Sequence, residues 1–202
     1  MAPRSAEQIE AMRQERRVHI LRTALRLFAR NGFDATSISL LAREAGMAKG
    51  LVYTYFASKD ELLQAVIQDG REQMETMFAA ALTEQAPLRQ LEELLRMSFR
   101  MLRQNGEFWS LYFSMLIRVD HAAQMQDVSR RMYEETRQMI EAIFEQLGRQ
   151  PARYEAAKLL ALLDGIGLHA WSLWPREFPL DEFEENLVRE YCSTHSNTST
   201  QP

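Results

Sequence analysis

The stretch from Ser37 to Lys59, SISLLAREAGMAKGLVYTYFASK, constrains the fold of this chain more than any other part of the sequence. Its first half has apolar residues at the spacing of one helix face, at Ile38, Leu41, Ala42 and Ala45. Ser37 is a favourable N-cap for this helix, and Gly46 is placed to end it, because glycine adopts the left-handed conformation without a steric penalty. Only two residues separate Gly46 from the next helical run, so the sequence predicts a helix, a tight turn and a second helix.

The second helix of this pair divides into an inward and an outward face. Val52 and Phe56, four residues apart, are predicted to face inward together with Ala48. The outward face carries Lys49, Gly50, Tyr53 and Thr54. A helix that enters the major groove of DNA needs positive charge, small residues where backbones approach, and hydroxyl groups that reach phosphates or base edges. The outward face meets these needs, although two short helices that meet at a glycine also occur in ordinary protein cores.

The flanking segments predict one more helix on each side. Before the pair, a helix over residues 13–30 is predicted from the apolar stripe Ile20, Leu21, Ala24, Leu25 and Phe28. It should end at Asn31-Gly32, and residues 1–12 are expected to form a loose arm. After the pair, Ser58 and Glu61 have the spacing of a capping box, which places Lys59 in the first turn of a further helix.

Together these segments resemble the DNA-binding domain of the TetR (tetracycline-repressor) family of transcriptional regulators. The resemblance rests on the pattern A-x-x-A-G-(x)2-K-G-x-x-Y-x-Y-F-x-S-K-x-x-L, carried here by Ala42, Ala45, Gly46, Lys49, Gly50, Tyr53, Tyr55, Phe56, Ser58, Lys59 and Leu62. Two positions depart from the family pattern. Ser39-Leu40 replaces a polar or charged pair, and Ala48 replaces a serine at the start of the recognition helix. The first change removes a reader of bases and the second removes a helix cap.

The resemblance implies an all-α fold of about nine helices. Residues 1–60 would form a three-helix DNA-binding domain with a helix-turn-helix, residues 61–192 a helical ligand-binding and dimerisation domain, and residues 193–202 a disordered tail. Our hypothesis assigns phosphate contacts to Thr36, Ser37, Lys49, Tyr53, Tyr55 and Lys59. It assigns base-edge contacts to Ser39, Gly50, Leu51 and Thr54.

The charge distribution supports a nucleic-acid partner at one end of the chain. The formal net charge of −4 argues against such a partner. Residues 1–60, however, carry ten basic and six acidic residues, whereas residues 61–202 carry 14 basic and 22 acidic residues. A protein with a basic head, residues 1–60, and an acidic body, residues 61–202, can approach DNA by its head only.

Composition also bounds the class of protein. At 202 residues, with 46% hydrophobic and 26% charged residues, the chain is typical of a globular protein. Cys192 is the sole cysteine, which indicates a reducing compartment, and no secretory signal is recognisable, so we expect a cytoplasmic location. The apolar run at 159–174 contains Asp164 and His169 and is too short to span a bilayer, so no membrane partner is expected.

The rest of the chain predicts further helices at roughly 59–83, 88–104, 108–119, 124–146, 152–174 and 180–191. They carry a surplus of methionine and aromatic residues, which suits a cavity for hydrophobic ligands. With the polar anchors Arg118 and His169, the candidate ligand-binding set is Met97, Met101, Phe108, Trp109, Phe113, Arg118, Met132, Tyr133, His169 and Trp171. Filling a helical core is the competing interpretation for each of the apolar members.

The last two long helices are expected to pair with their copies in a homodimer, as the resemblance implies. Gly165 and Gly167 cost helix stability, about 1 kcal/mol each relative to alanine, so close approach of a twin helix would explain them. The predicted surface is Leu159, Leu160, Leu163, Ile166, Phe183, Leu187 and Tyr191, with an ordinary core within one chain as the alternative.

An enzyme is not expected, because no acid, base or nucleophile motif is recognisable. The four histidines are scattered and there is no cysteine pair, so we expect no metal site, and the pattern implies no cofactor. The sequence predicts a ligand-responsive, dimeric, DNA-binding transcriptional regulator, a repressor released from a palindromic operator by a small hydrophobic molecule. The alternatives are a helical protein-interaction module that does not read DNA, and a small-molecule carrier or enzyme.

Overall fold

The structure is a computed structural model that describes residues 5–81, 83–84, 86–116, 122–173 and 177–193. These residues form nine α-helices and a π-helical turn, with no strand among them, so the predicted all-α fold is confirmed. The elements are α1 (Ala6–Asn31), α2 (Ile38–Glu44), α3 (Lys49–Tyr53), α4 (Lys59–Ala81), α5 (Pro87–Gln104), α6 (Gly106–Leu116), α7 (Ala122–Gln146), α8 (Ala152–Leu168), the π-helical turn η2 (His169–Leu173) and α9 (Leu180–Cys192).

The helices divide into two compact units. The first unit comprises Met1–Gln73 and Glu107–Arg118, and the second comprises Met74–Gly106 and Val119–Pro202. The first unit therefore includes the start of α4 and most of α6 besides α1, α2 and α3. This division does not follow the boundary at residue 60 expected from the sequence, and the functional domain boundary stays a prediction.

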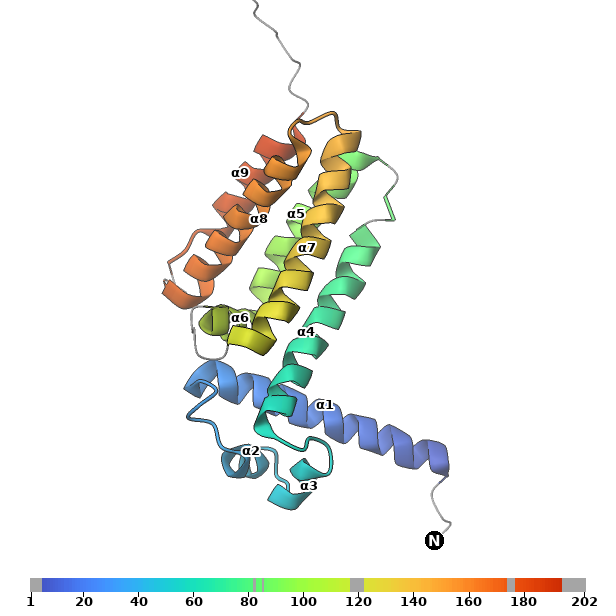
Figure 1. The fold of residues 1–202 in the computed structure, drawn as a ribbon, viewed down its shortest axis with the longest axis vertical. Coiled ribbons are helices and arrows are strands. Elements are labelled where there is room, and N and C mark those ends of the chain that lie inside the picture. The colour runs from blue at the N-terminus through green and yellow to red at the C-terminus, as the bar shows by residue number, and fades with distance from the viewer. Residues whose placement is uncertain (1–4, 82, 85, 117–121, 174–176, 194–202) are drawn as a thin grey trace, which may run out of the picture. The chain divides into compact units, whose positions relative to one another are not determined.

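In the first unit, α2 and α3 lie side by side against one side of α1 (Figure 1). The core that holds them is apolar and tightly closed, with Ile20, Ala24, Leu41, Val52 and Leu62 all fully buried. Gly32 ends α1 with φ 80°, so the predicted stop at Asn31-Gly32 is confirmed. Burial of these side chains supplies most of the stability of such short helices, because a five-residue helix is marginal by itself.

The start of α1 differs from the prediction. Residues 6–12 are helical rather than a loose arm, and Ser5 is the N-cap. The Ser5 hydroxyl accepts a hydrogen bond from the Gln8 N–H at 3.2 Å, and the Gln8 side chain accepts one from the Ser5 N–H at 3.1 Å. This reciprocal capping box stabilises a helix start that has no apolar stripe. Residues 1–4 lie outside the described residues.

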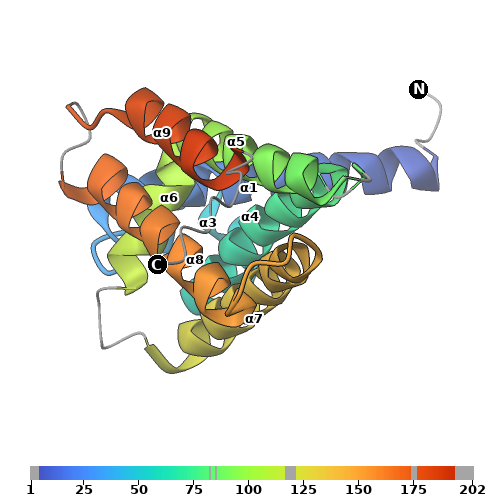
Figure 2. The same ribbon diagram turned by 90° about the horizontal axis from the view of Figure 1, so that it is seen from above.

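In the second unit, α9 packs against α5 and α7 packs against α8, with all four helices running side by side (Figures 1 and 2). Ion pairs fasten α9 to α5, since the Arg103 guanidinium lies 2.6 Å from the Asp181 carboxylate and 2.5 Å from that of Glu184. The hydrogen bond to Glu184 is the main cause of a raised pKa at Arg103. The start of α9 is therefore held to the end of α5 by charge as well as by apolar packing.

The apolar set predicted as a dimer surface is divided by the structure. Leu159, Ile166, Leu187 and Tyr191 are buried within the chain's own core, so their assignment to a surface between subunits is wrong. Phe183, by contrast, is 39% exposed. An amphipathic stripe has the same pattern whether it packs on its own chain or on a partner. Gly165 has space around it, because a Cβ added there would meet nothing within 4 Å in the part of the chain that the structure describes.

Candidate nucleic-acid interface

The helix-turn-helix begins with α2, which is held at both ends as the sequence predicts. The Ser37 hydroxyl accepts a hydrogen bond from the Leu40 N–H at 3.1 Å and so caps the helix. Gly46 takes φ 66°, and the N–H of Met47 donates to the carbonyl of Ala42 at 2.8 Å across the turn. The turn is therefore closed by backbone hydrogen bonds, which fixes the direction in which α3 leaves α2.

The predicted inward and outward residues of the second helix are largely confirmed, although α3 ends at Tyr53, so Thr54 and Phe56 follow the helix rather than lie in it. Val52 and Phe56 are buried, and Lys49, Gly50, Tyr53 and Thr54 are exposed. Ala48 is the exception, because it is exposed rather than inward. It also provides no side-chain cap, as its replacement of serine predicts.

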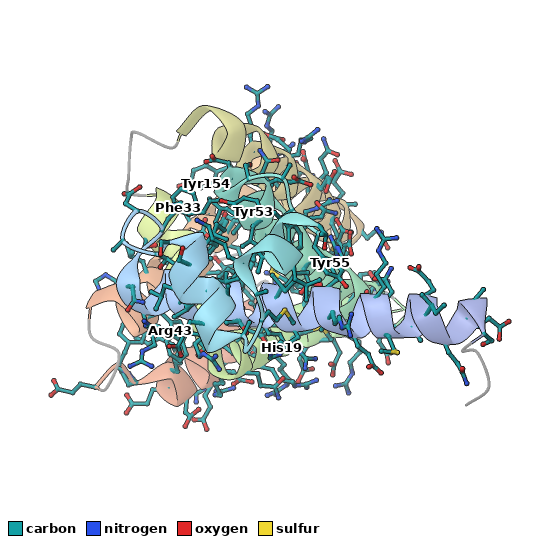
Figure 3. The ribbon with its side chains drawn as sticks, turned by 90° about the horizontal axis from the view of Figure 1, so that it is seen from below. His19, Phe33, Arg43, Tyr53, Tyr55 and Tyr154 are labelled. Atoms are coloured by element: carbon teal, nitrogen blue, oxygen red, sulfur yellow. The ribbon has the colours of Figure 1, made fainter. Side chains whose placement is uncertain are left out.

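The other predicted DNA-contacting residues lie around this exposed face. Ser37 and Ser39 are exposed, whereas Leu51 and Tyr55 are half-buried. Figure 3 looks onto α2 and α3 and labels Arg43 on α2 and Tyr53 and Tyr55 beside α3. The Lys49 ammonium lies 6.0 Å from the centre of the Tyr53 ring, and the Thr54 hydroxyl donates to the Leu51 carbonyl at 2.7 Å. The Thr54 hydroxyl oxygen can still accept a hydrogen bond from outside the chain.

Gly50 has no structural reason within the described chain to be a glycine. It lies in α3 without a positive φ, it is exposed, and a Cβ added to it would meet nothing within 4 Å. A glycine in a helix costs about 1 kcal/mol relative to alanine. The exposed surface of α3 therefore lacks a side chain at a position where an alanine would fit and would favour the helix.

Thr36 does not fit its predicted role in phosphate binding. Its side chain is 1% exposed, and its hydroxyl donates to the carbonyls of Gly32 at 2.8 Å and Leu27 at 3.3 Å. Its backbone N–H donates to the Phe33 carbonyl at 3.1 Å. Both donors are used inside the protein, so Thr36 closes the turn after α1 and cannot hold a phosphate.

Lys59 is fixed more firmly than the sequence suggests. Its ammonium donates to the carbonyls of Phe33 at 3.0 Å and Asp34 at 3.4 Å, and it lies 4.2 Å from the centre of the Phe33 ring. It therefore fastens the start of α4 to the loop that precedes α2. An ammonium group has three N–H donors, so one remains for a further acceptor. The capping box of this helix is shifted by one residue, since Glu61 accepts from the N–H of Ala57 at 2.6 Å.

Two positioning residues on α1 escape the sequence analysis. The Nε2 atom of His19 lies 3.1 Å from the Ala45 carbonyl at the end of α2, and because a carbonyl only accepts, Nε2 donates. The Arg17 guanidinium lies 5.5 Å from the centre of the Phe56 ring, just after α3. Both contacts join positions far apart in sequence, so no local pattern could indicate them.

The predicted ligand-binding residues are spread over both units. In the first unit Phe108, Trp109 and Phe113 belong to one aromatic cluster of α6, with Trp109 and Phe113 stacked at 5.6 Å. Phe108 and Phe113 are buried in it, and a Cβ on Gly70 would lie 2.1 Å from the Phe108 ring.

In the second unit the predicted ligand-binding residues have varied surroundings. Met97 and Met101 are buried on α5, and His169 stacks on Phe178 at 5.8 Å. Trp171 packs on Gly106, and its indole N–H is buried without a hydrogen-bond partner in the described part of the chain. Tyr133 is 37% exposed, which does not fit the predicted place in the lining of an apolar cavity. Arg118 and the side chain of Met132 lie outside the described residues.

Two protein families match different segments of the chain. Residues 20–66 match the family described as bacterial regulatory proteins, tetR family. Residues 87–195, more than half of the chain, match the BetI-type transcriptional repressor, C-terminal family. The chain belongs to the TetR family. Both the predicted family and the predicted regulator class are confirmed by these matches.

Individual relatives of this TetR-family chain are distant over most of its length. The first curated regulators that it matches are 41–47% identical over 49–54 residues, which span only 17–25% of their own length. The regulator BetI from Vibrio vulnificus is 24% identical over 160 residues, which cover 76% of this chain and 79% of BetI. The relatives are named as regulators, not as enzymes.

Solved structures share the fold of this TetR-family chain. FadR from Bacillus subtilis, in complex with stearoyl-CoA, aligns with a TM-score of 0.74 and 17% identity, covering 87% of this chain and 97% of FadR. A transcriptional regulator from Saccharomonospora viridis, in complex with choline, aligns with a TM-score of 0.70 and 22% identity, covering 90% of this chain and 97% of that one. At these identities the likeness concerns the fold alone. No helix in the described ranges is long and apolar enough to cross a membrane, and no group of three metal-ligating side chains occurs there.

Proposed function

We propose that this TetR-family chain is a homodimeric repressor that binds a palindromic operator and is released from it by a small hydrophobic molecule. The observation that carries the proposal is the exposed face of α3. Val52 and Phe56 are buried beneath it, while Lys49, Gly50 and Tyr53 are left outside the core. A regulator of this kind acts on DNA in the bacterial cytoplasm and binds its ligand without converting it.

The exposed face divides into backbone-positioning and base-reading groups. Lys49, Tyr53 and Tyr55 contact phosphates together with Ser37, whose hydroxyl lies at the start of α2. Gly50 lets the duplex approach α3 closely, and Leu51, Thr54 and Ser39 reach the base edges.

Lys59 adds a cation that is already in position. Because two of its N–H groups are bound to the carbonyls of Phe33 and Asp34, its ammonium group is held in place before DNA arrives. A held side chain loses little conformational entropy on binding, so its remaining N–H can donate to a phosphate at low cost.

The dimer would place two copies of α3 in successive major grooves. We propose that α8 and α9 pair with their copies, which is supported by the exposed apolar side chains Leu162 and Phe183 and by the open space at Gly165. Two heads then occupy half-sites about one helical turn apart. A ligand that favours a different spacing of the heads lowers the affinity for DNA, and DNA lowers the affinity for the ligand by the same factor.

The ligand class is supported by the residues of the second unit and of α6. Buried methionines and stacked aromatic rings suit an apolar molecule of variable shape. FadR is named with stearoyl-CoA, which carries a long acyl chain, and the Saccharomonospora viridis regulator with choline, a quaternary ammonium ion. We favour the acyl class, because the buried methionines of α5 suit a flexible apolar chain.

The proposal is tested by fluorescence anisotropy with the DNA upstream of the protein's own gene, over a series of salt concentrations. The wild type should bind this DNA more tightly than scrambled DNA. Lys49→Ala should weaken binding to both and lower the salt slope by about 0.9 per head, the value for one lost phosphate contact. The control is Arg22→Ala, an equal loss of charge at an exposed position of α1 on the side away from its core.

The outcomes separate the proposal from its rivals. Equal binding of upstream and scrambled DNA by the wild type would contradict operator reading, and no DNA binding at all would favour a protein-interaction module. Stearoyl-CoA should release the DNA, whereas choline should not. Release by choline alone would replace the acyl class with a quaternary ammonium class.

A further inference from the structure

The N-terminal turns of α1 extend beyond the core of the first unit. The first buried residue of α1 is Ile20, although the helix begins at Ala6. From Ala6 to Arg16 no side chain is buried, and this segment is about 16 Å long at 1.5 Å per residue. Figures 1 and 3 show these turns running on past α3. We call Ala6–Arg16 the overhang of α1.

The overhang is held in a defined direction at both of its ends. Its start is capped by Ser5 and Gln8. Its base is fastened to the helix-turn-helix, because Arg17 lies over the Phe56 ring and His19 donates to the carbonyl of Ala45. The overhang is therefore a rigid continuation of the same helix that supports α2 and α3.

The helical period shows which residues continue the core-facing stripe of α1 into the overhang. Ile20 and Ala24 are fully buried, and positions four, seven and eleven residues before them lie on the same face. Those positions include Arg16 and Arg13, followed by Ile9. Arg17 and His19 flank this face and contact Phe56 and the Ala45 carbonyl, so its continuation lies on the side of α1 on which α2 and α3 lie (Figure 1).

The charge of this face is available to a partner. Arg13 and Arg16 are exposed, and within the described ranges neither guanidinium has an ion-pair partner. The nearest acids are Glu15 and Glu10. Glu15 adjoins Arg16 in sequence, but the helical period places it about 100° round the helix from Arg16, off this face. Glu10 lies about one turn before Arg13, and its carboxylate accepts a hydrogen bond from Gln14 at 2.9 Å. A pair of free guanidinium groups one turn apart is suited to phosphate oxygens on a duplex.

We infer that the overhang is a second DNA-binding surface, in which Arg13 and Arg16 contact phosphates of the DNA that flanks each half-site. The inference rests on the proposed function, because α3 must first place the duplex beneath the first unit. It adds contacts that carry no sequence information, so it should raise affinity for flanked operators without changing base preference. Two contacts contribute about 1.8 to the salt slope per head.

The test compares two double variants of the same helix. Arg13→Gln with Arg16→Gln removes the overhang's charge, and Arg22→Gln with Arg26→Gln removes the same charge from exposed positions on the opposite side of α1. Glutamine and arginine have similar helix propensities, so both variants should keep the wild-type circular dichroism spectrum. Binding is measured on the upstream operator with native flanks and on a duplex trimmed to the footprint of the two α3 helices.

On the flanked duplex the Arg13/Arg16 variant should lose affinity at least tenfold and lower the salt slope by about 1.8 per head, and hydroxyl-radical footprints should shrink at both outer ends. On the trimmed duplex it should bind as the wild type does. Equal losses in both double variants, or equal losses on both duplexes, would overturn the overhang inference while the wild type still reads its operator. A wild type that does not discriminate its operator would overturn the proposed function itself, and this inference with it.

Discussion

Replacing Gly50 by alanine should affect the stability of the helix-turn-helix and its DNA binding in opposite directions. A Cβ at this position meets nothing within 4 Å among the described residues, so the variant should fold without strain. Alanine is favoured over glycine in a helix and reduces the freedom of the unfolded chain, which together stabilise the protein by about 0.4–1 kcal/mol. For a chain of this length that corresponds to a melting temperature higher by roughly 1–4 °C.

The same methyl group should harm DNA binding. If the duplex approaches α3 at Gly50, the added Cβ displaces it and at least one neighbouring base contact is lost, at about 1–3 kcal/mol. Operator affinity should then fall about 5-fold to 150-fold for each head that reads the operator, whereas binding to scrambled DNA should change far less. The assay is anisotropy with both duplexes beside a thermal melt of the same preparation. A variant that melts higher and binds its operator as tightly as the wild type would refute close approach at Gly50.

Three further predictions concern residues whose surroundings are set by packing within the chain. Gly106→Ala should lower the melting temperature by about 2–12 °C, because a Cβ there would lie 2.2 Å from the Trp171 ring and overpacking costs about 1–3 kcal/mol; an unchanged melt would contradict that packing. Thr36→Val should destabilise the protein by about 1–2 kcal/mol in urea unfolding, because its hydroxyl donates to the carbonyls of Leu27 and Gly32 inside the protein. The salt slope of DNA binding should stay unchanged. A lower slope in the variant would indicate that Thr36 does contact DNA. Burial raises the pKa of the Cys192 thiol to about 11. Near pH 7, iodoacetamide should therefore alkylate this thiol on the order of 100-fold more slowly in the folded chain than in the urea-unfolded chain, and the rate should rise toward pH 11. Equal rates in the folded and unfolded chains would contradict the burial.

The local features of the helix-turn-helix could be predicted because each depends on residues close together in sequence. Ser37 caps α2, Gly46 turns the chain, and the four-residue spacing of Val52 and Phe56 selects the buried side of α3. These signals act within one or two helical turns. A single sequence therefore contains all the information that they require.

The side chains that join the elements to one another could not be predicted in this way. Lys59 and His19 each bind carbonyls that are 25 or 26 residues away, and such contacts depend on the folded arrangement. Thr36 has a hydroxyl group close to a helix start, as a phosphate-binding residue would, but packing in the folded protein buries this hydroxyl. The early start of α1 does have a local sequence signal, because Ser5 and Gln8 have the spacing of a capping box. The sequence analysis predicts a loose arm there instead, since residues 6–12 have no apolar stripe.

The apolar stripes of the last helices show a further limit. Leu187 and Tyr191 recur at a helical spacing, and burial within one chain or against a second chain would produce the same pattern. The structure assigns them to the chain's own core. The exposed Leu162 and Phe183 remain for the proposed dimer surface.

The most direct test of the central claim is a selection of bound fragments from genomic DNA, followed by footprinting of the enriched site. The claim is that the exposed face of α3 reads DNA. It predicts one enriched palindrome with two protected half-sites about a helical turn apart, and loss of this enrichment in a variant with Lys49→Ala and Tyr53→Ala that keeps its fold. Enrichment of no sequence by the wild type, or of the same palindrome by that double variant, would contradict it.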